Sequence, residues 1–118
     1  MNHQRRKING ALAAAALFAP WAAWSQAFPT HPLRMIIPFA PGGTTDVIGR
    51  LVAQHLSDLL GQQVIADNRS GANGNIGTDL AAKSPPDGYT MVMSFDGTMT
   101  INPHTYRKLP FDPQRDLT

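Results

Sequence analysis

The sequence predicts an α/β domain in which three strands alternate with two helices in the order βαβαβ. Three observations lead to this prediction: short apolar segments bounded by proline and glycine, a longer segment with apolar residues at helical spacing, and Gly-rich turns after the strands. Strands that alternate with helices form parallel sheets through right-handed crossovers. Ligands of such sheets bind beyond the carboxyl ends of the strands.

The first strand is expected at residues 33–39, which are apolar, few and bounded by prolines, as in a buried parallel strand. The next helix is expected to begin with the hydroxyl of Thr44 or Thr45 as N-cap, to hold Asp46 in its first turn, and to end at Gly61. Its predicted apolar face consists of Val47, Ile48, Leu51, Val52, Leu56, Leu59 and Leu60.

Two further strands and one helix complete the pattern. The second strand is expected at 64–67, and after the Gly-rich stretch 68–74 a second helix is expected at 75–83, ended by Pro85 and Pro86. The third strand is expected at 89–94, followed by a loop at 96–98. Residues 101–118 contain three prolines and no recognisable closing element, so we expect an incomplete sheet with an open edge.

Residues 1–27 have the layout of a secretory signal peptide. Arg5, Arg6 and Lys7 precede an apolar run at 8–24, and the small-residue pattern Ser25-Gln26-Ala27 follows it. The run is Ala-rich and shorter than a membrane-spanning helix requires. We therefore expect an exported protein that is cleaved after residue 27 and has no stable membrane insertion afterwards; the alternative is an uncleaved N-terminal anchor. The paired arginines leave Sec and twin-arginine export open.

Charge and composition exclude several classes of function. The chain carries ten Lys and Arg against eight acidic residues, but three of the ten lie in the leader, which leaves seven against eight in residues 28–118. This balance gives no support for a nucleic-acid surface. The sequence has no cysteine, so disulfides, thiolate nucleophiles and Cys-based zinc sites are excluded. Because His31, His55 and His104 lack the spacing of metal ligands, no metal site is expected.

Ligand binding is expected at the loops that follow the strands. At 38–46, two glycines, two hydroxyls and the free amides of a helix N-terminus suit a carboxylate or phosphate, although an ordinary strand-to-helix turn would also need the glycines. In the second loop, Asn73 and Asn75 suit either a polar ligand or helix capping. The glycines at 71–77 lack the spacing and position of a dinucleotide fingerprint, and Ser94 lacks the G-x-S-x-G elbow of a hydrolase.

Several ordered motifs resemble the Bug, or TctC-like, substrate-binding proteins of tripartite tricarboxylate transport systems. They are the stretches 32–46, 67–77, 86–90, 101–103 and 109–113. The resemblance implies a periplasmic binding protein type 2 (Venus-flytrap) fold that holds a small organic or amino-acid carboxylate between two lobes, needs no cofactor, and in the full-length protein serves membrane transporter subunits. Residues 28–118 are then the N-terminal part of the first lobe, with the second lobe absent, and the chain is expected to be truncated.

Carried over residue by residue, the resemblance implies nine ligand-binding positions and no catalytic residue. They are Phe39, Ala40, Gly43, Thr44 and Asp46 in the first loop, Ala72 and Asn75 in the second, and Asp96 and Thr98 in the third. An acidic Asp96 beside an anion is unfavourable unless it meets an ammonium group or a water. Two alternatives stay open: an exported α/β enzyme fragment with a dinucleotide-binding half, in which Asp67 would bind ribose, and a nonfunctional remnant that does not fold.

Overall fold

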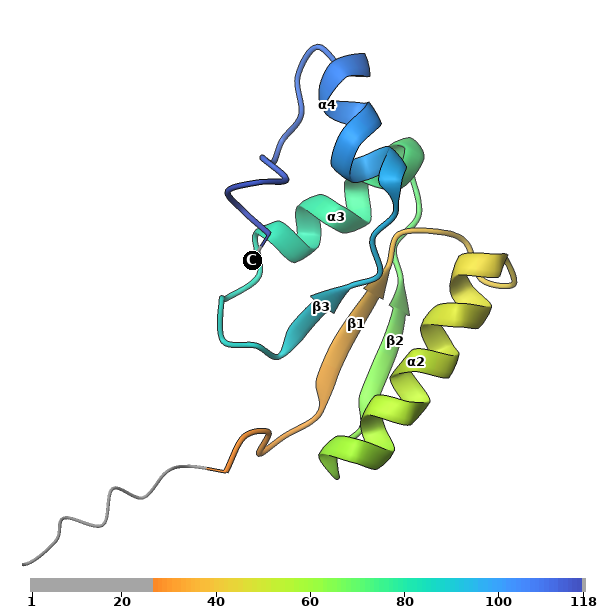
Figure 1. Ribbon diagram of the computed structural model, residues 1–118, viewed down its shortest axis with the longest axis vertical. Coiled ribbons are helices and arrows are strands. Elements are labelled where there is room, and N and C mark those ends of the chain that lie inside the picture. Colours follow the sequence, from red (N-terminus) through yellow and green to blue (C-terminus); the bar gives the residue numbers. More distant parts are fainter. Residues whose placement is uncertain (1–26, 118) are drawn as a thin grey trace, which may run out of the picture.

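The structure is a computed structural model that describes residues 27–117, so the predicted signal peptide lies outside the described residues except for Ala27. A parallel sheet of order β2–β1–β3 is formed by β1 (Leu33–Ile37), β2 (Val64–Asn68) and β3 (Thr90–Val92). Helix α2 (Thr44–Leu60) joins β1 to β2, and α3 (Asn75–Ala82) joins β2 to β3 (Figure 1). The predicted βαβαβ order and parallel sheet are confirmed. No helix within residues 27–117 is long and apolar enough to span a membrane.

The side chains of the central strand β1 alternate between the two helices. Leu33 and Met35 belong to the core cluster that also contains Ala53 of α2. Pro38, just after the strand, lies against α3, where a Cβ added to Gly77 would come within 2.9 Å of it. Since neighbouring side chains of a strand point to opposite faces, α2 covers one face of the sheet and α3 the other. Each Leu or Met buried in this way contributes about 1.5–3 kcal/mol.

The carboxyl ends of the three strands meet at one edge of the sheet, as the arrowheads in Figure 1 show. β1 ends at Ile37, two residues before the predicted end, because Pro38 has no N–H to donate to a neighbouring strand. The last bonds of the ladder run from Arg69 N–H to the Ile37 carbonyl and from Met93 N–H to the Ile36 carbonyl, each at 2.8 Å. The three loops that leave this edge are therefore brought together by the sheet.

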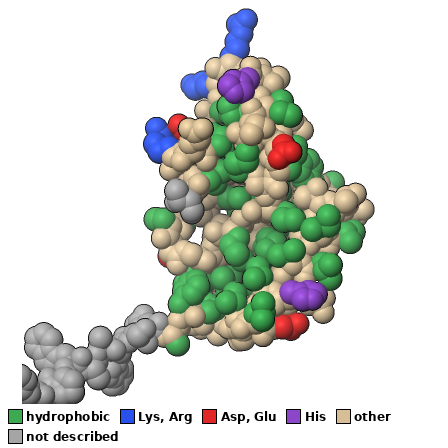
Figure 2. All heavy atoms as spheres, in the orientation of Figure 1, with side chains coloured by type: hydrophobic (Ala, Val, Ile, Leu, Met, Phe, Trp, Pro, Cys, Tyr) green, Lys and Arg blue, Asp and Glu red, His purple; other side chains and the backbone are tan. Residues whose placement is uncertain are grey.

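The apolar face predicted for α2 is largely wrong. The residues of α2 that are buried are Asp46, Gly49 and Ala53, and only Leu56 and Leu60 of the predicted face pack against the core. The other five predicted members are exposed: Val47, Ile48, Leu51, Val52 and Leu59. The helix lies so close to the sheet that a Cβ on Gly49 would be 2.8 Å from Ile37, so small residues face inward. Figure 2 shows hydrophobic side chains exposed on the surface as a result.

The chain after β3 is helical where a loop was predicted at 96–98. A π-helical segment, Gly97–Ile101, continues directly into α4 (Asn102–Thr105), which is tilted above α3 in Figure 1. Pro103 is the second residue of α4, and because the π-helical segment runs into α4 without a break, its missing N–H removes one helical hydrogen bond there. The π-helical segment contacts the short 3-10 turn Ala72–Gly74 that precedes α3. The second and third strand-end loops are thus in direct contact.

Candidate functional site

The three strand-end loops meet around Gly74. The ring of Phe39, from the first loop, lies edge-to-face against the ring of Phe95, from the third, with centroids 4.8 Å apart. A Cβ on Gly74, in the second loop, would lie 2.9 Å from the Phe95 ring and 3.0 Å from the Thr98 methyl group. Gly74 also has φ +84, a left-handed conformation that glycine adopts without strain. Only glycine lets the three loops approach this closely.

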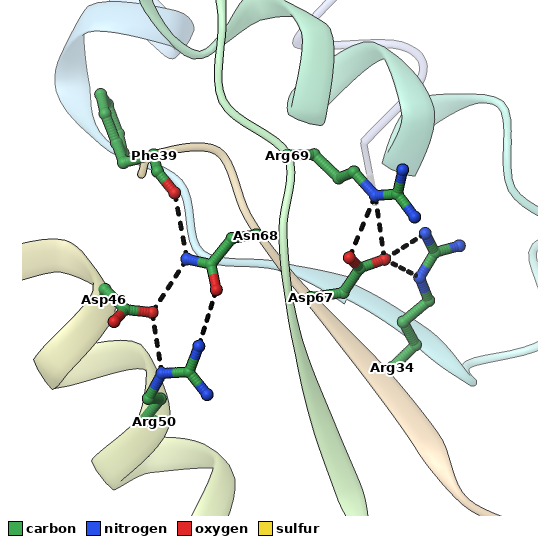
Figure 3. A network of polar contacts seen from close by, with 7 residues as sticks. All are labelled: Arg34, Phe39, Asp46, Arg50, Asp67, Asn68 and Arg69. Atoms are coloured by element: carbon green, nitrogen blue, oxygen red, sulfur yellow. Dashed lines mark hydrogen bonds and ion pairs between the residues drawn. The ribbon is translucent and has the colours of Figure 1, made fainter. Parts of the chain in front are cut away.

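The first loop is organised by the carboxylate of Asp46, which is 4% exposed. Its Oδ2 accepts the Gly42 N–H at 2.9 Å, and its Oδ1 accepts Nδ2 of Asn68 at 2.8 Å and Nε of Arg50 at 2.9 Å (Figure 3). The Gly42 hydrogen bond, followed by those from Asn68 and Arg50, lowers the pKa of Asp46 to about 2. Both oxygens are occupied by the protein, so Asp46 shapes the loop from within.

Asn68 completes this network and was not among the predicted site residues. Its Nδ2 also donates to the Phe39 carbonyl at 3.0 Å, and its Oδ1 accepts Nη2 of Arg50 at 2.7 Å (Figure 3). Its role could have been predicted from its position, because Asn68 is the last residue of β2 and pairs with Ile37 at the end of β1 in the parallel sheet. Asn68 therefore ties the second strand to the backbone of the first loop.

The predicted hydroxyl cap of α2 is wrong. The N-cap is Gly43, and no side chain makes a capping hydrogen bond there. Thr44 is exposed and Thr45 half-buried. Because the first N–H groups of a helix have no carbonyl partner within it, they remain available at this edge. Ala40, Gly43 and Thr44, all exposed, line the opening of the loop.

The second loop is a left-handed turn. Ala72 and Asn73 have φ values of 46 and 52, and Gly74 N–H donates to the Gly71 carbonyl at 3.0 Å. Left-handed geometry costs a non-glycine residue about 1–2 kcal/mol, so the surroundings must hold it in place. Asn75, at the start of α3, is 5% exposed and its Oδ1 accepts Nδ2 of Asn102 at 2.6 Å. Ala72 is exposed at the edge.

The third loop contributes one exposed and one buried member of the predicted site. Asp96 is exposed at the start of the π-helical segment. Thr98 is fully buried, and its hydroxyl donates to the Phe95 carbonyl at 3.1 Å and lies 3.2 Å from Oγ of Ser94. The hydroxyl of Thr98 therefore holds the loop together. At the surface of the site lie Ala40, Gly43, Thr44, Ala72 and Asp96.

A second charged cluster lies on the sheet beside β2. Asp67 accepts Nε of Arg34 at 2.7 Å and Nε of Arg69 at 3.0 Å, and Arg34 Nη2 forms an ion pair with the same carboxylate (Figure 3). Burial raises the pKa of Asp67, but the hydrogen bonds from Arg34 and Arg69 outweigh it and leave the pKa lowered. With both oxygens held by guanidinium groups, Asp67 is not free to bind ribose hydroxyls.

Two hollows adjoin the described residues. One of about 230 Å³ lies next to the second loop and is lined by Ala72, Asn75, Ile76, Asp79, Tyr106, Lys108 and Pro110. The larger, of about 480 Å³, lies between the end of α3 and β3, away from the strand-end loops. Because the polar groups converge at the loops, the larger hollow has no part in the candidate site. No cluster of three His, Asp or Glu side chains suited to a metal ion occurs among the residues that the structure describes.

The chain is similar in sequence to known proteins. The family model of the tripartite tricarboxylate transporter family receptor matches residues 48–118. Protein BugT of Bordetella pertussis is 51% identical over 107 residues, which cover 90% of this chain and 32% of that protein. The family match begins after the first loop, whereas the similarity to BugT covers nearly the whole chain.

Solved structures resemble the described fold. An R. palustris protein with adipate is 42% identical, with a TM-score of 0.71, over 74% of this chain and 29% of the other. MatC from Rhodopseudomonas palustris with bound malate is 32% identical, with a TM-score of 0.72, over 75% and 30%. The chain spans about a third of the length of the curated and solved relatives it matches.

Proposed function

The chain belongs to the tripartite tricarboxylate transporter receptor family, and on this premise we propose that it forms part of an extracytoplasmic protein that captures a small organic or amino-acid carboxylate. The members of this family are solute-binding receptors and not enzymes. The proposed ligand-binding positions are Asn75 and the exposed residues of the three loops, which are Ala40, Gly43, Thr44, Ala72 and Asp96. The captured solute is passed to membrane subunits of the transporter.

The observation that carries the proposal is the convergence of three loops at the carboxyl edge of a parallel sheet, with the N-terminus of α2 among them. Helix N-termini attract anions because their N–H groups are unpaired and the helix dipole is positive there. The Gly42 N–H is hydrogen-bonded to the Asp46 carboxylate. The backbone N–H groups of Gly43, Thr44 and Thr45 therefore remain to bind a ligand. A carboxylate is the anion that the relatives with adipate and malate support.

The structure argues against the alternative function, dinucleotide binding. Asp67, the residue that would bind ribose, is held by Arg34 and Arg69. Apart from the carboxylate of Asp96, the exposed polar groups of the predicted site residues at this edge are backbone amides and the Thr44 hydroxyl, which suit recognition without reaction. We therefore assign residues 28–118 to the N-terminal part of a first lobe, with the ligand closed in by a second lobe as in a Venus-flytrap protein.

Binding is tested by NMR titration of the ¹⁵N-labelled chain with malate and with adipate. We expect saturable shifts of the backbone amides at 42–46, 72–76 and 96–98, with weak affinity because one lobe buries little of the ligand. Sodium chloride at matched ionic strength and adipamide, which lacks the negative charges, are the controls. Shifts spread evenly over the surface, or the same shifts with adipamide, would refute carboxylate capture at this edge.

Export is tested separately. When the gene is expressed in a Gram-negative host, we expect the protein in the periplasmic fraction with Phe28 as its first residue, by mass spectrometry of the intact chain. The leader with its basic and apolar parts supports this expectation. Recovery of the uncleaved chain from the cytoplasm would contradict the proposed location.

A further inference from the structure

The side chain of Asn102, at the start of α4, is 1% exposed and joins the second loop by three hydrogen bonds. Its Nδ2 donates to the Asn73 carbonyl at 3.2 Å and to Oδ1 of Asn75 at 2.6 Å. Its Oδ1 accepts Nδ2 of Asn73 at 3.1 Å. Asn102 thus connects the helical segment after β3 to both residues that flank Gly74.

The order of donors and acceptors in this cluster is fixed by chemistry. The carbonyl of Asn73 can only accept a hydrogen bond, so the Asn102 amide must turn its Nδ2 toward it. The second hydrogen of that Nδ2 then requires an acceptor on Asn75, which has to be Oδ1. A backbone carbonyl therefore determines, through Asn102, which way the Asn75 amide points.

The opposite end of the Asn75 amide is its donor, Nδ2. Within residues 27–117, the one fully buried side-chain N or O atom without a partner is Oδ1 of Asp79, so Nδ2 of Asn75 is not sealed inside the protein. Asn75 follows Gly74, the residue around which the three loops meet. A donor at this position suits a carboxylate oxygen, whereas the Oδ1 end of the amide would repel one.

We propose that Asn102 is a positioning residue of the binding site, which holds the Asn75 amide with its NH₂ group toward the ligand and so selects an anionic oxygen. Asn102 itself does not touch the ligand. The effect on affinity rests on the proposed carboxylate binding, but the orientation of the amide does not, because it is a property of the free protein.

The orientation is tested first without ligand, by solvent exchange of the side-chain NH₂ groups in NMR. We expect the Asn102 NH₂ hydrogens to exchange slowly and those of Asn75 to exchange faster. Slow exchange of the Asn75 NH₂ group together with fast exchange at Asn102 would overturn the proposal. This measurement uses the unaltered chain and needs no variant to fold.

Asn102→Asp then tests the consequence for binding. Its carboxylate accepts from the Asn73 side chain and from Asn75, which turns the Asn75 amide round and directs Oδ1 toward the ligand, while the Asn73 carbonyl loses the donor that it has in the wild type. We expect affinity for malate and adipate to fall by about tenfold or more, the effect of losing a hydrogen bond to a charged group, and the Asn75 NH₂ hydrogens to become protected. Unchanged affinity in a folded Asn102→Asp variant would overturn the proposal.

Asn75→Asp is the second variant, because it keeps an acceptor for Asn102, removes the NH₂ donor and adds a negative charge on the side of the ligand. The same loss of affinity is expected with the stability of the chain retained, and wild-type affinity here would also overturn the proposal. If the unaltered chain binds neither malate nor adipate, the proposed function fails, while the exchange experiment still decides the orientation of the amide.

Discussion

Nδ2 of Asn68 lies 2.8 Å from Oδ1 of Asp46, although 22 residues separate them in sequence. The contact joins the end of β2 to the first turn of α2, and Asn68 extends it to the Phe39 carbonyl. The first strand-end loop is thus held in place by a side chain of the neighbouring strand. Gly43 and Thr44, on the outer surface of this loop, are exposed.

Asn68→Asp should destabilise the chain strongly. The substitution replaces the donor that faces Asp46 and the Phe39 carbonyl with an acceptor, so like groups oppose each other at the end of β2. We expect the free energy of unfolding, measured with urea, to fall by about 2–3 kcal/mol. The control is Gln63→Glu, the same chemical change at an exposed position, which should stay within about 0.5 kcal/mol of the wild type. An equal effect of both would contradict the role of Asn68.

The stability of the chain should decline in acid through Asp46. Its pKa is about 2 in the folded chain against an ordinary 3.8, so the unfolded state takes up the proton first as the pH falls. The stabilisation is therefore complete above the ordinary value and is lost as the pH falls through about 2. Thermal melts of the wild type and Asp46→Asn should show a gap in Tm that narrows in this range. A difference in Tm that stays constant with pH would mean that folding does not lower the pKa of Asp46.

The sequence was sufficient for the order of the elements and for the edge at which the loops gather. Alternating apolar segments and Gly breaks determine both, because a parallel βαβαβ unit has few ways to fold. The function of individual side chains was harder to predict. Asp46 and Thr98 have residue types that suit a ligand, but their oxygens are taken by Gly42, Asn68 and the Phe95 carbonyl. The Asn68 contact joins residues 22 positions apart and is not encoded by local spacing, whereas the Gly42 and Phe95 partners lie only four and three residues away from the side chains that they bind.

The inward face of α2 was misjudged for a different physical reason. Helical spacing identifies the most apolar stripe, whereas the short separation between α2 and the sheet admits only small residues: a Cβ on Gly49 would lie 2.8 Å from the Ile37 side chain. Leu59 is consequently 82% exposed and Ala53 only 3%. The helical segment after Asp96 was missed because glycine, threonine and proline weaken its local signal.

The close packing of α2 against the sheet predicts opposite results for two lysine substitutions. Leu59→Lys should change the free energy of unfolding by no more than about 0.5 kcal/mol, because the side chain is already in solvent. Ala53→Lys places a charge in the core beside Leu33 and Met35 and should leave the chain unfolded by circular dichroism. A stable Ala53→Lys variant together with an unfolded Leu59→Lys variant would restore the face predicted from spacing.

Gly74→Ala should cost more than the left-handed backbone alone explains. The new methyl group would meet the Phe95 ring and Thr98, in addition to the strain at φ +84. Gly42→Ala is the matched control, since Gly42 has φ +89 and nothing within 4 Å of its Cβ position. We expect about 1–2 kcal/mol for Gly42→Ala and a further loss of about 1–3 kcal/mol for Gly74→Ala, both from urea unfolding. Equal costs would mean that the three loops are not in close contact at Gly74.

Asp96→Asn should change selectivity between malate and aspartate, which differ by a hydroxyl and an ammonium group. Asp96 is exposed in the third loop, and at the proposed site its charge would repel the carboxylates of both ligands and attract only the ammonium group of aspartate. Removing the charge should tighten malate binding by about fivefold, because two unit charges at a solvent-exposed site interact by roughly 1 kcal/mol. The affinity for aspartate should fall or stay unchanged. NMR titration of both ligands gives the two affinities.

The control for this last substitution is Asp87→Asn, which removes the same charge just before β3, at the opposite end of the strand. Asp87 accepts the Tyr89 N–H at 2.9 Å, and an asparagine oxygen can still do so. Screening by salt reduces the effect of a distant surface charge, so the ratio of malate to aspartate affinity should stay at its wild-type value in Asp87→Asn. If both variants change that ratio equally, Asp96 acts only through the net charge of the chain and does not face the ligand.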